Sequence, residues 1–483
     1  MKLENLTALE IVDGIKSSKF TCVELVEYYL NQIEKFKDKN AVLEVFDDAL
    51  EHARIIDKKV ADKEDLPALV GVPILIKDNI MYKGKICSNA SKIMENSKAK
   101  YNASVIQKLL DAGCVILGRT NMDEFAMGGS CENSAFGPCK NAHDDTRVSG
   151  GSSGGSAVAV ACDMCAFALG SDTGGSVRQP SSFNGVVGIK PTYGRVSRYG
   201  LVEFAGSLDT VGVISKDVKD SAYVLSIIAG QDEKDNTSSA SLVDDYLQEI
   251  KDQIKGKKIA VVKEVWGLVA KTDYASVYQK VLNFCQEHGA IVTETSLPEY
   301  EAVLAVYYTL AMAEASSNMA RFDGIRYGQN GIKIDGIKDE YERSKSAYLG
   351  REVKRRIMLG NFILSSERYN SYYIKAKQIQ NYLRSRIKNI LSENDLIFMP
   401  TTYGEAFEIG SKTSDPVSMY IEDIFTVTAN IVSVPALSVP IGKGNSNLPI
   451  GLQILAREFN EKEIYNMADF IYTHYTLGGG LCK

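Results

Sequence analysis

The sequence predicts an α/β protein in which helices cover a central β-sheet. Short apolar runs typical of buried strands alternate with helical patterns along most of the chain. No internal repeat and no Pro- or Ser-rich linker interrupts this alternation. Length alone would suggest roughly two to four domains. Because no boundary is visible, we expect one large domain over residues 1–483, whose hydrophobic content of 45% suffices for a large core.

The N-terminal segment is predicted to be helical. Thr7 with Glu10, and Thr21 with Glu24, have the spacing of a capping box, in which each side chain accepts a hydrogen bond from the other residue's backbone N–H. Each pair opens an amphipathic run. Residues 72–76 (Val-Pro-Ile-Leu-Ile) then indicate a short buried strand that ends at Lys77.

The alternation continues to the C-terminal part of the chain. Residues 105–112 have helical spacing, residues 114–117 indicate a strand, and a loop is expected to begin at Arg119. The later elements are strands at 257–262, 290–293 and 396–400, a helix at 276–288, and a long, charged, helix-rich segment at 341–392.

Composition excludes several classes of protein. A net charge of −6 and a pI near 5.6 argue against a mainly electrostatic grip on nucleic acid. The N-terminus lacks the apolar core of a signal peptide, and the longest apolar run, 157–169, is interrupted by Asp163 and too short to span a bilayer. Nine cysteines, an odd number, suggest reduced thiols. We therefore expect a cytoplasmic protein without membrane contact.

Cys162 and Cys165 have the spacing of a redox or zinc motif. No second cysteine pair and no histidine pair accompanies them. We expect both to be small, buried apolar side chains, and no metal site.

Two turns rich in glycine and serine carry the strongest functional signal. Residues 150–156 read Gly-Gly-Ser-Ser-Gly-Gly-Ser, and residues 172–178 read Asp-Thr-Gly-Gly-Ser-Val-Arg. Glycine lets the backbone approach a ligand closely, and consecutive N–H groups in such turns can converge on a developing negative charge. One such turn alone would be an ordinary surface turn. The pair favours a catalytic site with one serine as nucleophile and a second as proton relay.

Three interpretations of the serine turns compete. Gly151-x-Ser153-x-Gly155 matches the nucleophile elbow of α/β-hydrolases, but that motif follows a buried strand, whereas residues 141–149 are polar. A Ser-His-Asp triad needs a histidine. The chain has four, none in a recognisable motif, and we expect His143 to be solvated.

In the third interpretation a lysine is the base. Lys77 follows an apolar strand directly, so its ammonium group can be desolvated. A pKa of ~10.4 must fall by roughly 3 units, or ~4 kcal/mol, for the amine to be largely neutral near pH 7.5, and burial produces shifts of that size. The alternative is an ordinary lysine at a strand end that reaches solvent.

Residues 72–78, 150–155 and 172–178 together resemble the amidase signature family, and the resemblance extends from about residue 6 to about residue 472. It implies a single α/β domain with a mixed sheet covered by helices on both faces. The core signature would span about 70–215, and a helix-rich pocket region about 300–430.

The resemblance also implies a mechanism. Neutral Lys77 accepts a proton from Ser152, Ser152 accepts one from Ser176, and Ser176 attacks an amide. It further implies a cis peptide bond between Gly151 and Ser152. The remaining implied residues are the oxyanion-hole N–H groups of Thr173, Gly174 and Gly175, and the supporting pair Asp172 and Arg178.

Within the family, the chain most resembles the A subunits of tRNA-dependent amidotransferases. The resembling stretches are residues 313–324, 352–360 and 415–420. They imply glutamine as the substrate, held at its charged end by Arg356 and Asp423, with Tyr307 nearby. Taken alone, residues 354–356 (Lys-Arg-Arg) look like a solvated helix face.

The same resemblance implies partners. The chain would join subunits B and C and supply ammonia for converting Glu-tRNA(Gln) to Gln-tRNA(Gln), and for Asp-tRNA(Asn) if that substrate is used. The misacylated tRNA, ATP and Mg would be handled by a partner subunit. This chain would bind no cofactor, which fits the absence of a P-loop motif from the sequence.

Two alternatives remain open. A stand-alone amidase for another small amide would not need the stretches around residues 313 and 356. A non-catalytic scaffold subunit would not need Lys77, Ser152 and Ser176 together.

Overall fold

The computed structural model describes residues 3–329 and 337–478, and one mixed β-sheet runs through these residues. Its eleven described strands lie in the order β1-β3-β2-β4-β6-β5-β10-β11-β9-β7-β8. The strands are β1 (Val42–Val45), β2 (Pro73–Lys77), β3 (Val115–Thr120), β4 (Phe167–Asp172), β5 (Val187–Lys190), β6 (Thr210–Ser215), β7 (Lys258–Val262), β8 (Ile291–Thr295), β9 (Leu396–Pro400), β10 (Ala436–Lys443) and β11 (Pro449–Leu455).

Strand direction changes across the sheet. β3, β2 and β4 are parallel; β6, β5, β10, β11 and β9 follow with antiparallel pairings; β9, β7 and β8 are again parallel. The expected α/β fold with a mixed sheet is confirmed.

The helices are α1 (Ala8–Lys16), α2 (Cys22–Lys35), α3 (Ala49–Ala61), α4 (Ser104–Asp111), α5 (Gly154–Ala161), α6 (Arg178–Asn184), α7 (Val218–Ile228), α8 (Lys263–Val269), α9 (Ala275–Glu287), α10 (Val303–Asn318), α11 (Ile337–Tyr348), α12 (Arg351–Leu364), α13 (Lys375–Glu393), α14 (Pro416–Ile421), α15 (Val427–Ile431) and α16 (Glu461–Phe470). Both expected capping boxes are present, at Thr7 before α1 and at Thr21 before α2.

One expected boundary is wrong. The loop predicted to begin at Arg119 begins after Thr120, because the backbone of β3 stays paired with β1 and β2 as far as Thr120. The Arg119 guanidinium bridges the carboxylates of Glu44 and Asp78, at 2.7 and 2.8 Å, which keeps this charged residue inside the sheet.

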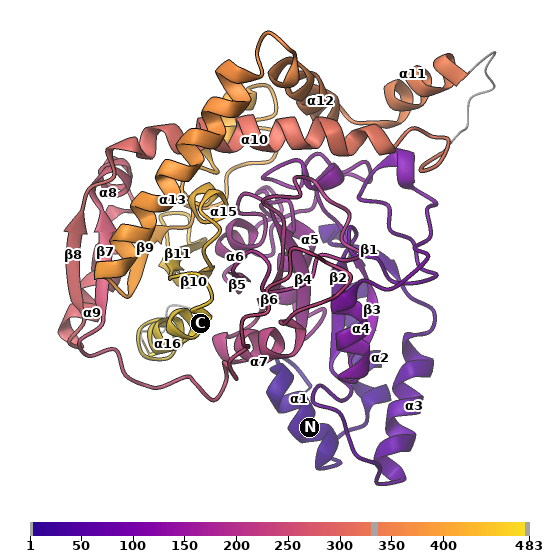
Figure 1. Ribbon diagram of the computed structural model, residues 1–483. Helices are drawn as coiled ribbons and strands as arrows, with labels where there is room; N and C mark the ends of the chain where they lie inside the picture. Colours follow the sequence, from indigo (N-terminus) through magenta and orange to yellow (C-terminus); the bar gives the residue numbers. More distant parts are fainter. Residues whose placement is uncertain (1–2, 330–336, 479–483) are drawn as a thin grey trace.

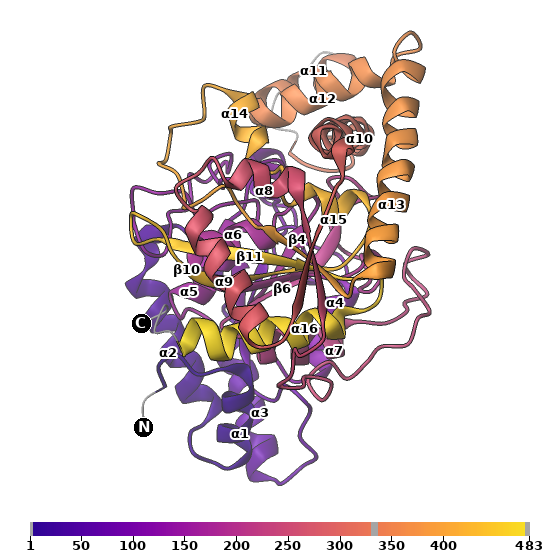
Figure 2. The same ribbon diagram turned by 90° about the vertical axis from the view of Figure 1, so that its left-hand side faces the viewer.

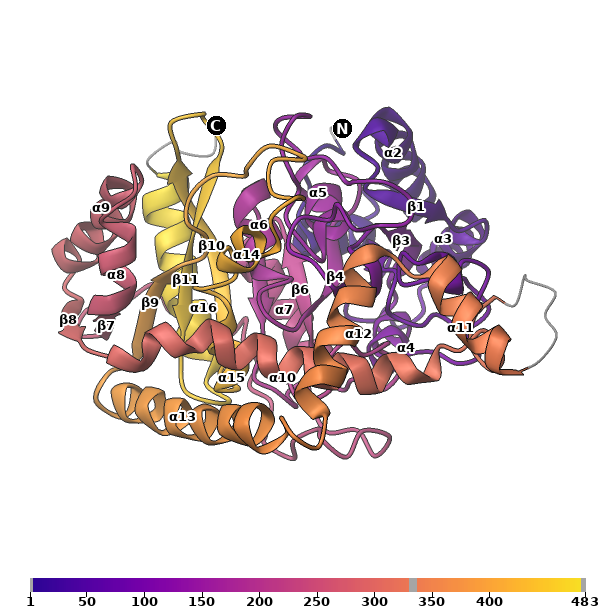
Figure 3. The ribbon, with the colours of Figure 1, turned by 90° about the horizontal axis from the view of Figure 1, so that it is seen from above.

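Helices cover both faces of the middle strands. α5 and α6 pack on each other over one face, and α7 and α16 pack on each other over the opposite face (Figures 2 and 3). The first pair lies very close to the sheet. A Cβ added at Gly170 in β4 would lie 2.9 Å from Cγ2 of Val177, just before α6. Glycine in the strands thus brings the ends of α5 and α6 down onto the sheet.

A second group of helices lies across the strand ends. α10 crosses above the sheet in the view of Figure 1, with α12 and α13 packed against it. The contact between α10 and α12 is so close that a Cβ added at Gly360 would lie 2.0 Å from the carbonyl oxygen of Met312. The expected helix-rich character of residues 341–392 is confirmed.

The described cysteines, including Cys162 and Cys165, are buried free thiols, as expected. Among residues 3–329 and 337–478, no helix combines the length and the apolar character needed to cross a bilayer.

Candidate active site

Lys77 is the last residue of β2, with β3 and β4 paired on either side, so its side chain is fully buried. Its Nζ lies 2.7 Å from Oγ of Ser152, 2.9 Å from Oγ of Ser171 and 3.2 Å from the carbonyl oxygen of Ser171. Burial lowers the pKa of Lys77 to about 7. A neutral amine has two N–H donors for Ser171 and one lone pair for the Ser152 proton. The expected burial of Lys77 is confirmed, and the alternative of a lysine reaching solvent is wrong.

Ser152 and Ser153 form the turn that leads into α5. The peptide bond between Gly151 and Ser152 is cis, as the family resemblance implies. The Oγ of Ser153 both donates to the carbonyl of Ser171 (3.2 Å) and accepts from its N–H (3.3 Å). Ser153 therefore ties the turn to β4, and no described strand lies within residues 141–149 to make it a nucleophile elbow.

Ser176 lies between β4 and α6, directly beside this turn. Its carbonyl accepts a 3.0 Å hydrogen bond from the N–H of Ser153, which holds the two glycine-rich turns together. The side chain is 7% exposed, and within the described parts of the chain its hydroxyl has no hydrogen-bond partner. The link from Lys77 to Ser152 is formed in this structure; a link from Ser152 to Ser176 is not.

The turn before Ser176 presents backbone N–H groups. Gly175, at φ +131°, donates its N–H to Oδ1 of Asp172 at 2.9 Å. The N–H groups of Thr173, Gly174 and Ser176 donate to no residue that the structure describes. Three of these four N–H groups are therefore available to a ligand oxygen, whereas the one expected at Gly175 is engaged within the turn.

Asp172 and Arg178 lie behind the turn as a fully buried ion pair, with 2.9 Å between Nη2 and Oδ1. Burial alone would raise the pKa of Asp172, but the charge and hydrogen bonds of Arg178 hold it well below the usual range. The guanidinium also donates to the carbonyl of Thr426 (2.8 Å), to Oδ1 of Asn430 (2.7 Å) and to Gln453. A charge this deep is stable only with such a complete set of partners.

Arg356 lies on α12, and its side chain is buried, with only 3% of the residue exposed. Its Nε donates to Oε1 of Glu352 at 2.9 Å, and Tyr420 donates to the same oxygen at 2.8 Å. The guanidinium lies 5.3–5.5 Å from the ring centres of Phe204, Tyr308 and Tyr420. The solvated helix face suggested by residues 354–356 is therefore wrong for Arg356.

Asp423 follows α14 and lies on the same side as Arg356. Its Oδ2 accepts a 2.6 Å hydrogen bond from Tyr308, whose ring also faces the Arg356 guanidinium. Loss of water around the carboxylate raises the pKa of Asp423. Tyr308 therefore contacts both Arg356, through its ring, and Asp423, through its hydroxyl.

Tyr307 connects this charged end with the serine turn. A Cβ added at Gly174 would lie 2.3 Å from its hydroxyl oxygen, so the two are in direct contact. Tyr307 and Tyr308 are consecutive on α10, and one reaches the turn while the other reaches Asp423. The two consecutive tyrosines therefore link the turn before Ser176 with Asp423.

Several residues of the site were not predicted from the sequence. Ser171 could have been found, because it directly precedes Asp172 at the end of a buried strand. Glu352, Tyr308 and Thr426 carry no local signal of their own and become visible only through the fold.

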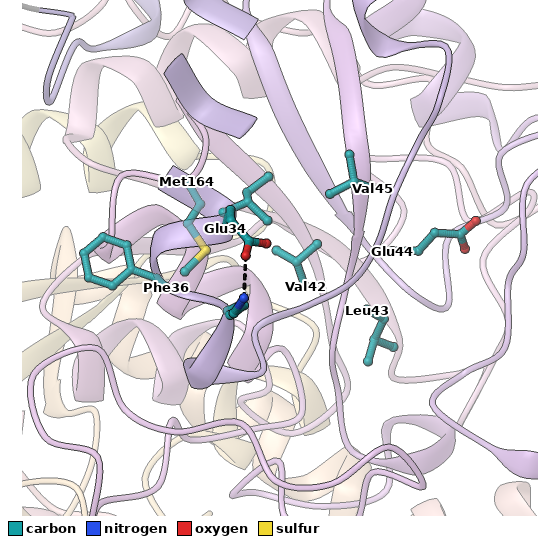
Figure 4. A pocket seen from close by; sticks show the side chains of 9 residues that line it. Glu34, Phe36, Val42, Leu43, Glu44, Val45 and Met164 are labelled. Atoms are coloured by element: carbon teal, nitrogen blue, oxygen red, sulfur yellow. Dashed lines mark hydrogen bonds and ion pairs between the residues drawn. The ribbon is translucent and has the colours of Figure 1, made fainter. Parts of the chain in front are cut away.

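A separate surface pocket of about 210 Å³ lies where the end of α2 meets β1. Figure 4 shows apolar side chains of β1 and Met164 around Glu34, which forms an ion pair with Lys37 at 2.5 Å. None of its lining residues belongs to the site described above. In the described part of the chain, no group of three or more His, Cys, Asp or Glu side chains is arranged to hold a metal ion.

The chain is similar to known proteins over nearly its whole length. The A subunit of glutamyl-tRNA(Gln) amidotransferase from Thermoanaerobacter pseudethanolicus is 46% identical over 97% of this chain and 96% of the relative, and that from Lacticaseibacillus paracasei is 47% identical over 95% of each. The crystal structure of the A subunit from Thermotoga maritima superimposes with a TM-score of 0.79 at 37% identity, covering 98% and 95% of the two chains.

More distant relatives share the fold. Native peptide amidase from Stenotrophomonas maltophilia superimposes with a TM-score of 0.83 at 26% identity, covering 97% of this chain and 96% of the amidase. A sequence model described as Amidase matches residues 24–465. The chain therefore belongs to the amidase family.

Proposed function

We propose that this chain is the glutamine-hydrolysing subunit of a tRNA-dependent amidotransferase, with Lys77, Ser152 and Ser176 as its catalytic triad. The observation that carries the proposal is the buried Lys77 Nζ, 2.7 Å from Ser152 Oγ, beneath a turn that presents Ser176. The near full-length similarity to subunits named for this activity supports the choice of reaction.

The proposed chemistry begins at the neutral amine. Lys77 takes the proton of Ser152, Ser152 takes the proton of Ser176, and Oγ of Ser176 attacks the side-chain amide carbon of glutamine. The developing oxyanion accepts hydrogen bonds from the N–H groups of Thr173 and Gly174, each typically worth ~3–4 kcal/mol. Gly175 contributes by giving the turn its shape.

The C–N bond then breaks, and ammonia leaves with the relayed proton. Water attacks the glutamyl ester on Ser176, and its proton returns along the same relay, releasing glutamate. The sum is glutamine plus water to glutamate plus ammonia, which needs no metal, oxidant or cofactor on this chain.

Recognition of glutamine is assigned to the charged end of the site. The α-carboxylate would be held by Arg356, whose planar guanidinium suits a carboxylate, and the α-ammonium by Asp423. Tyr307 would lie along the side chain between these groups and the serine turn. The opposite charges of Arg356 and Asp423 favour a zwitterionic substrate here over a neutral amide, because they offset the cost of desolvating its charged groups.

The partners follow from this assignment. Subunits B and C would complete the complex, and a partner subunit would bind the misacylated tRNA and use ATP and Mg. The chain would work as one domain, residues 1–483, in the cytoplasm, where aminoacylated tRNA is consumed.

Ser176→Ala tests the proposed division of labour in the complex co-purified through this chain. We expect ammonia release from glutamine to be lost, because no other hydroxyl is placed to form the ester. Amidation of Glu-tRNA(Gln) should persist when ammonium chloride is supplied. A folded Ser176→Ala complex that ammonium fails to rescue would contradict the proposal, and a glutamyl adduct on Ser153 would move the nucleophile.

A further inference from the structure

Two consecutive carboxylates that the chemistry above does not use lie between the two ends of the site. Asp123 and Glu124 follow β3 and are 0% and 2% exposed. Burying a carboxylate is unfavourable unless it is hydrogen-bonded, so each must have specific partners. Those partners lie at opposite ends of the pocket.

Asp123 holds the segment 128–133 against the catalytic turn. Its Oδ2 accepts a 2.9 Å hydrogen bond from the N–H of Cys131, and its Oδ1 accepts one of 3.1 Å from the N–H of Asn133. A Cβ added at Gly151 would lie 2.1 Å from Oδ2, so this carboxylate also touches the residue before Ser152.

The segment 128–133 itself forms a wall between the two ends. A Cβ added at Gly129 would lie 3.4 Å from Oδ1 of Asp423. A cleft is lined by this segment and by α12, including Gly128, Ser130 and Arg356.

Glu124 holds the start of α12. Its Oε2 accepts a 2.7 Å hydrogen bond from the N–H of Gly350, the N-cap of that helix, and its Oε1 accepts from Ser91. A carboxylate at this position also interacts favourably with the N-terminal end of the helix dipole. Arg356 lies on the same helix, six residues after Gly350.

The backbone after these two carboxylates is constrained. Phe125, Ala126 and Cys131 have φ of +50°, +60° and +61°, a left-handed conformation that side chains other than glycine rarely adopt. Such a backbone persists only where its surroundings fix it. The hydrogen bonds of Asp123 to the backbone of Cys131 and Asn133, and of Glu124 to that of Gly350, help to fix it.

We propose that Asp123 and Glu124 are a pair of positioning residues that set the distance between the serine turn and Arg356, and so make the pocket select an amide of glutamine's length. Asp123 acts on the turn that holds Gly151 and Ser152, through segment 128–133. Glu124 acts on Arg356 through α12. The proposal rests on the proposed function for its substrate, but not for its effect on Ser176.

The proposed roles of Asp123 and Glu124 predict different kinetic changes. Asp123→Asn replaces one acceptor by an amide donor that faces backbone N–H groups, so the turn should shift and kcat should fall about tenfold with little change in KM. Glu124→Gln weakens the hold on α12, so KM for glutamine should rise about tenfold with a smaller change in kcat.

Hydrolysis of asparagine, which is one methylene shorter than glutamine, measures how strictly the pocket selects for length. A single methylene discriminates substrates by roughly 10–200-fold, so the glutamine-to-asparagine ratio of kcat/KM should fall in Glu124→Gln. Gly350→Ala should act in the same way from the other side of the contact, because its Cβ would lie 2.2 Å from Oε2 of Glu124.

Asp220→Asn is the matched control. Asp220 is also a fully buried carboxylate that accepts from two backbone N–H groups, of Ala8 at 2.6 Å and Leu9 at 3.1 Å, but it lies on α7. It should lose thermal stability and keep the wild-type substrate ratio. The proposal is overturned if Asp220→Asn shifts the glutamine-to-asparagine ratio of kcat/KM as much as Glu124→Gln does. It is also overturned if Glu124→Gln and Gly350→Ala lower kcat/KM equally for glutamine and asparagine.

Labelling of Ser176 by a sulfonyl fluoride separates this proposal from the proposed function. Asp123→Asn should label about tenfold more slowly than wild type and Glu124→Gln at the wild-type rate, whether or not glutamine is the substrate. Wild-type protein inactive on glutamine would overturn the proposed function alone. Equal labelling rates in wild type and Asp123→Asn would overturn the role of Asp123.

Discussion

Lys77 is fully buried and lies within hydrogen-bond distance of a serine hydroxyl, as its proposed role as a base requires. Desolvation removes the preference for the charged amine, and the lone pair left behind faces a hydroxyl 2.7 Å away. The nearby carboxylates of Asp123, Asp172 and Asp209 act in the opposite direction and keep its pKa from falling further. Their balance puts the titration of Lys77 close to neutral pH.

We therefore expect kcat for glutamine hydrolysis to rise with pH through about 7, because only the deprotonated amine accepts a proton. Below that pH the amine is charged and the rate should fall about tenfold per pH unit. Lys77→Arg should be nearly inactive at every pH, since guanidinium keeps its proton. A pH–rate profile of the two proteins from pH 5 to 9 makes the comparison, and an active Lys77→Arg would exclude the base role.

Arg356→Ala should raise KM for glutamine, because the substrate carboxylate would enter a desolvated site without a partner. Hydrolysis of a simple amide without an α-carboxylate should change much less. The loss of the guanidinium also removes one of the two ion pairs that Glu352 forms on α12, the other being with Arg355, so a thermal melt must accompany the kinetics. Equal losses on both substrates would show that Arg356 has only a structural role.

At the scale of elements, the site depends on the fit between α10 and α12. α10 carries Tyr307 and Tyr308, and α12 carries Arg356. Gly360 lets the two helices approach to backbone contact. The position of the arginine relative to the turn is thus a property of helix packing.

Gly360→Ala tests this dependence. The added methyl group would meet the carbonyl of Met312 at 2.0 Å, which neither helix can relieve by moving a side chain alone. Overpacking of this kind costs roughly 1–3 kcal/mol, and the displaced α12 should raise KM for glutamine. Gly267→Ala on α8, where an added Cβ has open space, is the control; it should not lower Tm, because alanine favours the helix over glycine, and it should leave KM unchanged.

The elements that the sequence predicted best are those whose signal is local. The capping boxes at Thr7 and Thr21 and the strand 396–400 depend on adjacent residues only, and the structure has them as expected. The end of β3 was misplaced because Arg119 is charged, and a charged residue in a sheet is explained only by partners far away in the sequence.

The candidate site divides in the same way. Lys77, Ser152 and Ser176 lie in motifs, whereas the inward orientation of Arg356 was obscured by Lys354 and Arg355. Its position on α12 did contain a signal, since residues 353, 356, 360 and 363 form one buried stripe. The partners of Arg178 could not be predicted, because they depend on the order of strands in the sheet.

At the scale of the whole molecule, the sheet joins strands that are far apart in the sequence. β10 pairs with β5 on one side and with β11 on the other, so strands from residues 436–455 lie at the centre of the sheet. The two ends of the sheet therefore cannot separate without breaking the strand pairings of β10.

We therefore expect a single cooperative unfolding transition. The one tryptophan of the chain, Trp266 on α8, reports the end of the sheet formed by β7 and β8, while far-UV circular dichroism reports the whole molecule. Urea transitions followed by the two signals should coincide. Midpoints that differ beyond error would indicate two domains.

The buried Arg178 has a consequence for protein synthesis. Its hydrogen-bond partners extend to Gln453, so a ribosome that has exposed residues 1–400 has already delivered Lys77, Ser152 and Ser176 without the groups that fix the turn between them. The last strands to emerge are also the ones that complete the middle of the sheet. We therefore expect a nascent or prematurely terminated chain that lacks these residues to be inactive, so that under the proposed function incomplete chains would release no ammonia.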